Sequence, residues 1–166
     1  MRKRKVLNNK YTLISTAHFP YNTRRKGAKQ ALLGIGGNMG DVVRRFENLF
    51  WYLKRSKYIH IYRTAAILKN PAFGYTEQED FYNSLIQIET SLTPRALLSY
   101  VLRIEKVFGR KRSFKDAPRT LDIDIIFYEN IQMETKDLRL PHPQWMKRPS
   151  VLIPLRYMQD KRRRRQ

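Results

Sequence analysis

The sequence predicts an α+β fold: a ferredoxin-like βαββαβ antiparallel sheet with helices on one face, followed by a C-terminal extension. Two amphipathic helical segments alternate with four apolar, β-branched segments in that order, and no internal repeat is visible. A chain of 166 residues, 42% of them hydrophobic, can bury one sizeable core. We therefore expect one domain over residues 31–159, between a basic N-terminal arm (residues 1–30) and a basic tail (residues 160–166).

The net charge of +20 is concentrated at the two ends of the chain. Residues 1–30 contain nine of the 34 Lys and Arg residues and no acidic residue, and Lys161–Arg165 contain five more. Charge runs at chain ends are usually solvated, so this excess alone does not indicate a nucleic-acid partner. Pro20 and the basic cluster at Arg24–Lys29 predict an irregular arm, with room for one short strand at Tyr11–Ser15.

Cysteine is absent from the sequence, which excludes disulfides, thiolate metal sites and cysteine nucleophiles. No apolar run approaches the roughly 20 residues that cross a bilayer, and the N-terminus lacks the apolar core of a signal peptide. We therefore expect a cytoplasmic protein without a membrane partner.

The first predicted strand, Ala31–Ile35, leads into the turn Gly-Gly-Asn-Met-Gly-Asp at residues 36–41. A helix begins there with Asp41 as its N-cap, and an apolar stripe follows at helical spacing, formed by Val42, Phe46, Leu49, Phe50 and Leu53. The turn carries neither a Walker lysine nor the full dinucleotide glycine spacing. We therefore interpret it as a tight turn or as one wall of a small-molecule pocket.

Two more strands, Tyr58–Thr64 and Phe81–Glu89, are separated by a segment with few core candidates, residues 65–80. A loop of this length inside a compact domain is usually functional, often a lid. The second helix begins after Thr93-Pro94, an N-cap followed by proline at the first helical position, and Gly109 is a natural C-cap. Its buried face is predicted to contain Leu97, Leu98, Val101, Ile104 and Phe108.

The last predicted strand, Leu121–Tyr128, is apolar except for Asp122 and Asp124. Residues two apart in a strand point to the same face, so the two carboxylates repel each other and lose solvation unless a positive group compensates them. Such a pair can bind Mg²⁺, which takes oxygen ligands and completes its shell with substrate phosphates. Arg119, just before the pair, is placed to meet such a phosphate. The alternative is an acid pair that faces solvent or forms salt bridges on an edge strand.

The segment around this pair resembles the signature of a known enzyme family. Its sequence, Ala117-Pro118-Arg119-Thr120-Leu121-Asp122-Ile123-Asp124-Ile125-Ile126, is similar to the motif of the 6-hydroxymethyl-7,8-dihydropterin pyrophosphokinases of folate biosynthesis. Companion motifs follow the family's order between residues 31 and 155: the Gly-Gly-Asn turn, Tyr62-Arg63-Thr64, Asp80-Phe81-Tyr82-Asn83, Arg103-Ile104-Glu105, Gly109-Arg110 and Leu140-Pro141-His142. The family's fold is the ferredoxin-like one.

The resemblance implies transfer of the pyrophosphoryl group from ATP to the hydroxymethyl oxygen of the pterin, with release of AMP. It implies that Asp122 and Asp124 ligate two Mg²⁺ ions, and that Arg110 and Arg119 are catalytic because they grip the phosphates and assist the transition state. The implied ATP contacts are Glu105, Arg112, Lys115, His142 and Arg148. The implied pterin contacts are Thr64, Ala65, Ile67, Phe81, which would stack on the ring, and Asn83, which would read its hydrogen-bonding edge. ATP and the pterin are the expected partners of a monomer, with no specific nucleic acid.

The sequence departs from the family pattern at two positions. Asp116 stands where the family often has tryptophan, and Ser150 stands where a second aromatic residue typically covers the pterin; Trp145 is a candidate substitute. A degenerate member that binds without reacting is therefore one alternative. The other is a nucleic-acid-binding module on the same fold, suggested by the basic ends, although the acids of the last strand would repel phosphate without a metal.

Overall fold

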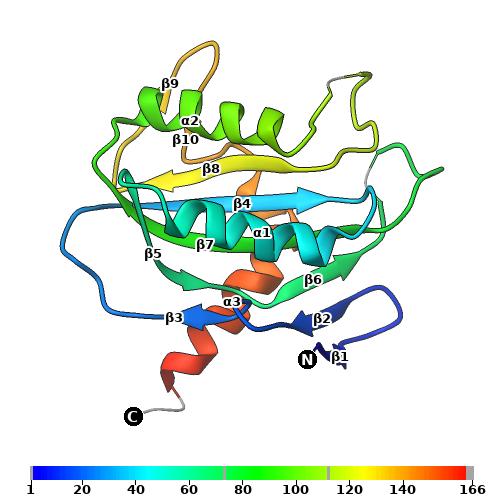
Figure 1. Cartoon of the computed structure of the whole chain (residues 1–166). Helices are drawn as coiled ribbons and strands as arrows, with labels where there is room; N and C mark the ends of the chain where they lie inside the picture. Colours follow the sequence, from blue (N-terminus) through cyan, green and yellow to red (C-terminus); the bar gives the residue numbers. More distant parts are fainter. Residues whose placement is uncertain (1, 73, 112, 164–166) are drawn as a thin grey trace.

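The computed structural model describes residues 2–72, 74–111 and 113–163, with side chains as far as Met158. Eight strands form one open sheet, three α-helices cover its faces, and two further short strands pair separately (Figure 1). Every pairing among the described strands is antiparallel. The fold is therefore a mixed α and β architecture on an antiparallel sheet, and the sequence prediction is confirmed at that level.

The centre of the sheet is strand β4 (Lys29–Gly37), which lies between β7 (Phe81–Thr90) and β8 (Asp122–Tyr128). β7 also pairs with β5 (Ile59–Thr64) along its C-terminal half and with β6 (Ile67–Asn70) along its N-terminal half. β8 ends the order of strands. The acid pair therefore lies on the last strand of the sheet, separated by β4 alone from β7, which carries the predicted pterin residues Phe81 and Asn83.

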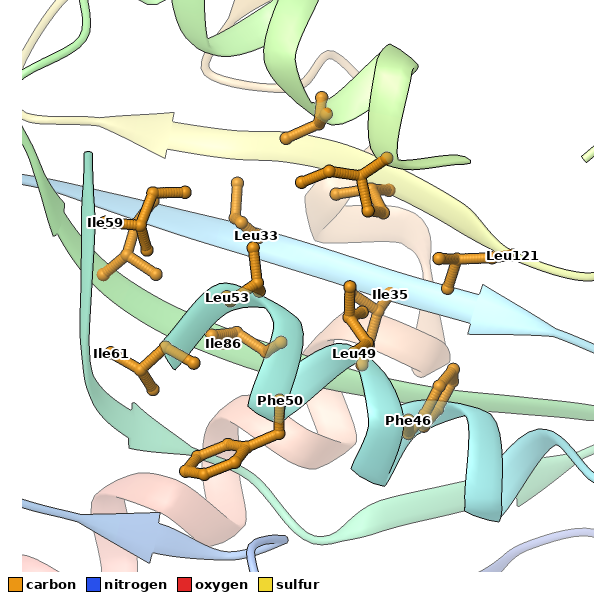
Figure 2. Close-up of a cluster of buried hydrophobic side chains, with 14 of the residues drawn as sticks. Leu33, Ile35, Phe46, Leu49, Phe50, Leu53, Ile59, Ile61, Ile86 and Leu121 are labelled. Atoms are coloured by element: carbon orange, nitrogen blue, oxygen red, sulfur yellow. The ribbon is translucent and has the colours of Figure 1, made fainter. Parts of the chain in front are cut away.

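Helices α1 (Val42–Lys54) and α2 (Pro94–Val107) pack on one face of the sheet (Figure 1). Asp41 and Thr93 cap them as predicted, because each side chain accepts a hydrogen bond from the backbone N–H three residues further on. The predicted apolar stripe of α1 is buried. In the core of Figure 2, the α1 side chains Phe46, Leu49, Phe50 and Leu53 face Leu33, Ile35, Ile61 and Ile86 of the sheet.

The C-terminal extension forms helix α3 (Pro149–Arg163), which covers the other face of the sheet (Figure 1). Its buried residues Val151 and Met158 belong to a second apolar cluster that also contains one residue from each of β4, β7 and β8: Leu32, Leu85 and Ile126. The sheet is thus covered by α1 and α2 on one side and by α3 on the other, and the start of α3 lies close to β8.

The segment between β8 and α3 contains little regular secondary structure. It contains the two-stranded sheet of β9 (Met133–Glu134) and β10 (Arg139–Leu140), and a single 3-10 turn, η1 (Trp145–Lys147). No helix in the described part of the chain is long and apolar enough to cross a membrane.

The N-terminal segment differs from the irregular arm that the sequence predicted. β1 (Lys3–Val6), β2 (Thr12–Ser15) and β3 (Tyr21–Asn22) are strands of the main sheet, where β2 pairs with β6 and β3 pairs with β5. The short strand proposed at Tyr11–Ser15 is confirmed as β2. Phe19, between β2 and β3, is fully buried in the α1 core. The prediction of an irregular segment is wrong because these strands depend on edges formed by residues far along the chain.

The segment over residues 65–80, predicted as one long loop, contains β6. Ile67 and Leu68 are buried there, with β2 on one side and β7 on the other. A strand of four residues is too short to show a reliable period, so the sequence did not reveal it. Of the described residues between β6 and β7, none is helical or in a strand, and a loop is confirmed for that part.

Glu89 on β7 anchors the residues that lead into β4. Its side chain is 1% exposed and accepts hydrogen bonds from the backbone N–H groups of Lys26 (2.6 Å) and Gly27 (3.0 Å) and from Nε of Arg25 (3.1 Å). Burial by itself raises the pKa of the Glu89 carboxyl, but these donors outweigh it and the pKa is lowered from its ordinary value. The ionised carboxylate therefore stabilises the folded chain.

We expect Glu89→Gln to lower the free energy of unfolding at about pH 7 by about 1.5–3 kcal/mol, as for hydrogen bonds to a charged group. Because the folded-state pKa lies below the unfolded-state pKa, this stabilisation is present above the unfolded pKa and is lost as the pH falls through the folded pKa. Urea unfolding at about pH 7 and about pH 3 should therefore give a smaller difference from wild type at the lower pH. Glu134→Gln is the control, because that side chain is 82% exposed. An equal difference at both pH values would contradict this role of Glu89.

Candidate active site

Asp122 and Asp124 lie on the face of β8 that points away from the α1–α2 core. The alternate residues Ile123 and Ile125 are buried in that core, so the two carboxylates project into a pocket on the α3 side of the sheet. The predicted placement on one face is confirmed. β4, β7 and the start of α3 complete the pocket through Gly34, Gly36, Asn83, Arg148, Ser150 and Val151.

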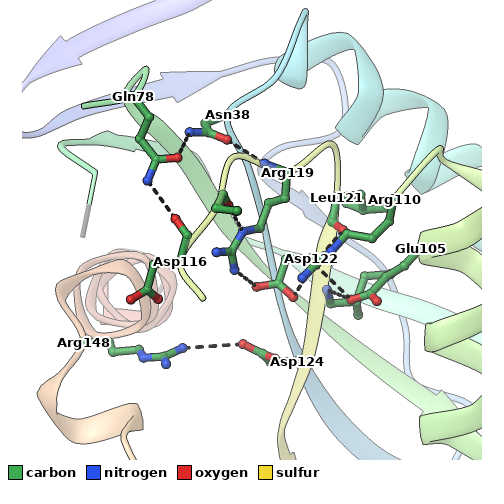
Figure 3. Close-up of polar contacts among 12 residues, drawn as sticks. Asn38, Gln78, Glu105, Arg110, Asp116, Arg119, Leu121, Asp122, Asp124 and Arg148 are labelled. Carbon is green, nitrogen blue, oxygen red and sulfur yellow. Dashed lines mark hydrogen bonds and ion pairs between the residues drawn. The ribbon is translucent and has the colours of Figure 1, made fainter. Parts of the chain in front are cut away.

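Asp122 is compensated by two arginines from different segments (Figure 3). Nη1 of Arg110 lies 3.0 Å from Oδ1, and Nη1 of Arg119 lies 3.2 Å from Oδ2. Arg110 follows the end of α2 and also donates to the carbonyl of Leu121 (3.1 Å). Arg119 lies in the segment before β8 and donates through Nε to the carbonyl of Ala117 (3.1 Å). The two predicted catalytic residues are thus brought together on one carboxylate.

Asp124 is less well compensated. Its ion pair with Arg148 is longer, with 3.5 Å between Nη1 and Oδ2 (Figure 3). Burial raises the pKa of Asp124 to about 7, repulsion by Asp122 adds to this, and Arg148 offsets only part of the effect. The ionised pair is therefore a place where a bound cation would be stabilised.

The chemistry of the donor set fits a hard cation shared with a substrate. Within the described ranges, no group of three or more His, Cys, Asp or Glu side chains could hold a metal by itself. Asp122 and Asp124 supply two carboxylates, and Mg²⁺ is commonly bound by one or two carboxylates together with water and substrate phosphates. The residues present therefore suit Mg²⁺ bound with a polyphosphate rather than a resident metal held by protein alone.

Glu105, predicted as an ATP contact, lies beneath the acid strand. It is 3% exposed on α2, and its Oε1 accepts a hydrogen bond from the backbone N–H of Ile123 (2.8 Å). The same carboxylate oxygen lies 3.8 Å from Nη1 of Arg110. In this structure Glu105 therefore connects α2 to β8 and supports the position of Arg110.

The other predicted ATP contacts come from the segments on either side of β8. His142 donates its backbone N–H to the carbonyl of Ile126 (2.8 Å), and burial together with the charge of Arg148 lowers the pKa of its imidazole. Arg148 lines the pocket itself. Lys115 is exposed in the loop between α2 and β8. Arg112 lies outside the described residues.

The predicted pterin contacts lie on β5, β6 and β7 and on the link between β5 and β6. Asn83 lines the same pocket as the acid pair. The guanidinium of Arg119 lies over the ring of Phe81, 5.5 Å from its centroid, which places the predicted stacking residue beside a predicted catalytic one. The other three residues are buried at the end of β5 and the start of β6: Thr64, Ala65 and Ile67.

Comparison with known proteins identifies the family of the chain. A family model described as 7,8-dihydro-6-hydroxymethylpterin-pyrophosphokinase matches residues 32–160. This chain belongs to that family. The resemblance seen in the sequence motifs is therefore confirmed for this pyrophosphokinase family.

Several bacterial relatives carry the name 2-amino-4-hydroxy-6-hydroxymethyldihydropteridine pyrophosphokinase. The chain is 42% identical over 151 residues to the one from Helicobacter pylori, a match that covers 89% of this chain and 93% of the relative. The relative from Campylobacter jejuni is 42% identical over 125 residues, covering 75% of this chain and 80% of the relative. The relative from Bacillus subtilis is 33% identical over 125 residues, covering 75% of each chain.

The two positions at which the sequence was expected to depart from the family pattern are Asp116 and Ser150. Asp116 adopts a left-handed backbone conformation, with φ of 58°, which aspartate tolerates better than a bulky residue does. Ser150 lines the pocket near the acid pair. Trp145, the candidate substitute for the second aromatic residue, packs edge-on against Phe127 with 4.9 Å between ring centroids.

Sequence reasoning missed the polar network that holds Arg119 in place (Figure 3). Oδ1 of Asn38 accepts a hydrogen bond from the backbone N–H of Arg119 (2.9 Å), and its Nδ2 donates to Oε1 of Gln78 (2.8 Å). Nε2 of Gln78 then donates to the carbonyl of Asp116 (2.9 Å). The network joins the turn after β4, the loop before β7 and the segment before β8. The asparagine in the Gly-Gly-Asn turn was the sequence signal that could have indicated it.

Proposed function

We propose that this chain transfers pyrophosphate from ATP to the hydroxymethyl group of 6-hydroxymethyl-7,8-dihydropterin, giving AMP and the pterin diphosphate in folate biosynthesis. The observation that carries the proposal is one pocket in which the acid pair, Arg148 and the Asn83 carboxamide meet, with Arg110 and Arg119 bound to the first acid. Membership of the pyrophosphokinase family indicates which reaction to expect. The pocket is the proposed location of that reaction.

In this reaction the hydroxymethyl oxygen forms a bond to the β-phosphorus of ATP. The bond from that phosphorus to the oxygen bridging the α-phosphorus breaks, AMP leaves, and the hydroxyl proton is released. Negative charge is spread over the transferred group, so catalysis depends on positive groups held in position beforehand. Arg110 and Arg119 meet this requirement because both side chains are largely buried and fixed by Asp122.

Arg119 retains hydrogen-bonding capacity for a phosphate. Of its side-chain nitrogens, Nε and Nη1 are engaged by described residues, at Ala117 and Asp122, which leaves Nη2 as a donor toward substrate oxygens. A planar, permanently charged guanidinium matches phosphate oxygens better than an ammonium group does. We therefore assign Arg119, together with Arg110, to stabilisation of the transferred group.

Asp122 and Asp124 are assigned as the carboxylates that would hold two Mg²⁺ ions together with ATP. When bound, Mg²⁺ would supply neutralisation of phosphate charge at the reacting centre. The raised pKa of Asp124, caused by burial and by repulsion from Asp122, supports this assignment because a cation would relieve both.

The remaining predicted residues are assigned to the two substrates. The ATP side comprises Glu105, Arg112, Lys115, His142 and Arg148. The pterin side comprises Thr64, Ala65, Ile67, Phe81 and Asn83. Because Asn83 and Arg148 line the same pocket as the acid pair, the two substrates would meet at Asp122 and Asp124.

The architecture is also assigned as ferredoxin-like. The strands that alternate with α1 and α2 are β4, β5, β7 and β8, and their order across the sheet is β8, β4, β7, β5. A split arrangement of this kind, with both helices on one face, is typical of that fold. The strands β1, β2, β3 and β6 and helix α3 would then be additions to it.

The function is tested by incubating the purified chain with ATP, Mg²⁺ and 6-hydroxymethyl-7,8-dihydropterin and separating the nucleotides by chromatography. We expect AMP and the pterin diphosphate to form in equal amounts. Omission of the pterin, or chelation of the metal with EDTA, should reduce AMP formation to background, and added Mg²⁺ should restore it. Formation of ADP in place of AMP, or AMP formation that does not depend on the pterin, would overturn the proposal.

A further inference from the structure

Asn70 and Asn83 form a pair of hydrogen-bonded carboxamides across β6 and β7. Asn70 is the last residue of β6 and pairs in register with Phe81, so Asn83 is its diagonal neighbour on the same face of the sheet. Nδ2 of Asn83 donates to Oδ1 of Asn70 at 2.7 Å. Asn83 lines the pocket, and Asn70 accepts the hydrogen bond from its amide nitrogen.

The orientation of both carboxamides is fixed by a backbone carbonyl. Nδ2 of Asn70 donates to the carbonyl oxygen of Pro71 at 3.0 Å. A carbonyl oxygen can only accept a hydrogen bond, so the amide nitrogen of Asn70 must face Pro71 and its oxygen must face Asn83. That oxygen in turn requires the amide nitrogen of Asn83. The two hydrogen bonds, from Asn70 to Pro71 and from Asn83 to Asn70, therefore determine the orientation of the Asn83 side chain.

The oxygen of Asn83 consequently lies over β4. Gly36 pairs with Asn83 in the β4–β7 register, and a Cβ atom added at Gly36 would lie 2.6 Å from Oδ1 of Asn83. Both residues line the pocket that contains Asp122. Glycine at position 36 leaves the space that the carboxamide occupies, and the atom that Asn83 presents there is a hydrogen-bond acceptor.

We propose that Asn70 is a positioning residue that fixes the Asn83 carboxamide with its oxygen toward the pocket, so that the site selects a ring edge that donates hydrogen bonds. This inference rests on the proposed function. The substrate named for the relatives carries a 2-amino group, which is such a donor. An analogue with oxygen at position 2 presents an acceptor to the Asn83 oxygen. A polar group that is held in one orientation and covered by the bound ring discriminates strongly against that mismatch.

The test uses Asn70→Ala and Asn70→Ser, which remove the acceptor from reach of Asn83, and Asn70→Asp, which keeps an acceptor oxygen there. Lys69→Ala is the matched control, because Lys69 lies on the same strand and its side chain points to the other face. For each variant, kcat and KM are measured with the pterin and with its 2-oxo analogue, and KM is measured for ATP.

Asn70→Ala and Asn70→Ser should raise KM for the pterin about three- to tenfold, the effect of losing one neutral hydrogen bond, and lower the preference for the 2-amino over the 2-oxo substrate about tenfold. KM for ATP and kcat should stay within about twofold of wild type, because Asn70 does not touch the reacting groups. Asn70→Asp should keep the wild-type preference, as should Lys69→Ala.

An unchanged substrate preference in Asn70→Ala and Asn70→Ser would overturn the inference. So would Asn70→Asp behaving like the alanine variant, or a parallel loss in kcat and in KM for ATP, which would indicate a general structural effect. Failure of the proposed function would look different, since the wild-type chain would then form no AMP with the pterin at all.

Discussion

Replacement of Asp122 or Asp124 by alanine is expected to lower kcat for AMP formation by at least about 10³-fold, because each change removes a carboxylate assigned to Mg²⁺ at the reacting phosphates. Lewis-acid stabilisation is worth several kcal/mol, and each tenfold loss of rate corresponds to about 1.4 kcal/mol. Single-turnover formation of AMP at saturating ATP and pterin measures the effect. Asp137→Ala is the control, because Asp137 is exposed in the turn between β9 and β10. Retention of more than about a tenth of wild-type kcat in either variant would refute the metal assignment.

Asp122 and Asp124 should contribute differently to the stability of the folded chain. Comparing their asparagine variants therefore distinguishes a loss of activity from a loss of folded structure. Asp122→Asn leaves Arg110 and Arg119 without their shared carboxylate, at contacts of 3.0 and 3.2 Å in the wild type, and should lower the melting temperature. Asp124→Asn removes a repelled charge. Without metal, that variant should be at least as stable as wild type while being equally inactive.

The pH dependence of this difference follows from the raised pKa of Asp124, about 7 in the folded chain. An acid whose folded-state pKa is raised contributes stability below its unfolded pKa and loses it as the pH rises through the folded pKa. Metal-free wild type should therefore lose stability relative to Asp124→Asn between about pH 4 and about pH 7. Thermal unfolding in EDTA across this range measures it, and a constant difference would contradict the charge argument.

The helices were predictable because their signals are local. Asp41 and Thr93 cap the residues that immediately follow them, and the stripe from Phe46 to Leu53 has the helical period within one segment. The strands β4, β5, β7 and β8 were predictable for the same reason, since each shows an apolar run or an alternation within its own segment.

The strands at the other edge were not predictable from local signals. β1 has a basic sequence with all four residues exposed, and β3 contains only two residues, so neither shows a hydrophobic pattern of its own. They form because β1 pairs with β2, β2 pairs with β6 and β3 pairs with β5. The last two pairings join residues more than 40 positions apart in the chain. Register between distant short segments is a property of the assembled sheet.

Some features of the candidate site were likewise predictable from local sequence, and others were not. The period of two placed Asp122 and Asp124 on one face, and the motifs indicated the arginines. The partners of each side chain did not follow, because they depend on how loops return to the strand. Arg148, just before α3, reaches Asp124, and Glu105 accepts a hydrogen bond from the backbone N–H of Ile123. The orientation of Asn83 depends on a neighbour in β6, a strand that the sequence did not reveal.

Arg119→Ala is expected to lower kcat by about 10²- to 10³-fold, as for loss of one group that stabilises developing charge in a transition state. KM for ATP should rise less, because the remaining cations near the pocket still attract the triphosphate. Arg139→Ala is the control, since that side chain is 59% exposed. The measurement is again AMP formation, with thermal unfolding of each variant determined alongside it.

Arg119→Lys distinguishes a catalytic arginine from a structural partner of Asp122. Lysine keeps the positive charge that Asp122 needs, but it lacks the planar fork that lets Arg119 bind the carbonyl of Ala117 and the carboxylate of Asp122 at once. The same fork would leave a donor for a phosphate oxygen, as proposed above. If Arg119 only neutralised Asp122, lysine would restore kcat along with stability. We expect it to restore most of the stability and less than about a tenth of wild-type kcat, because the phosphate then loses the donor that the carboxylate and the backbone hold in place.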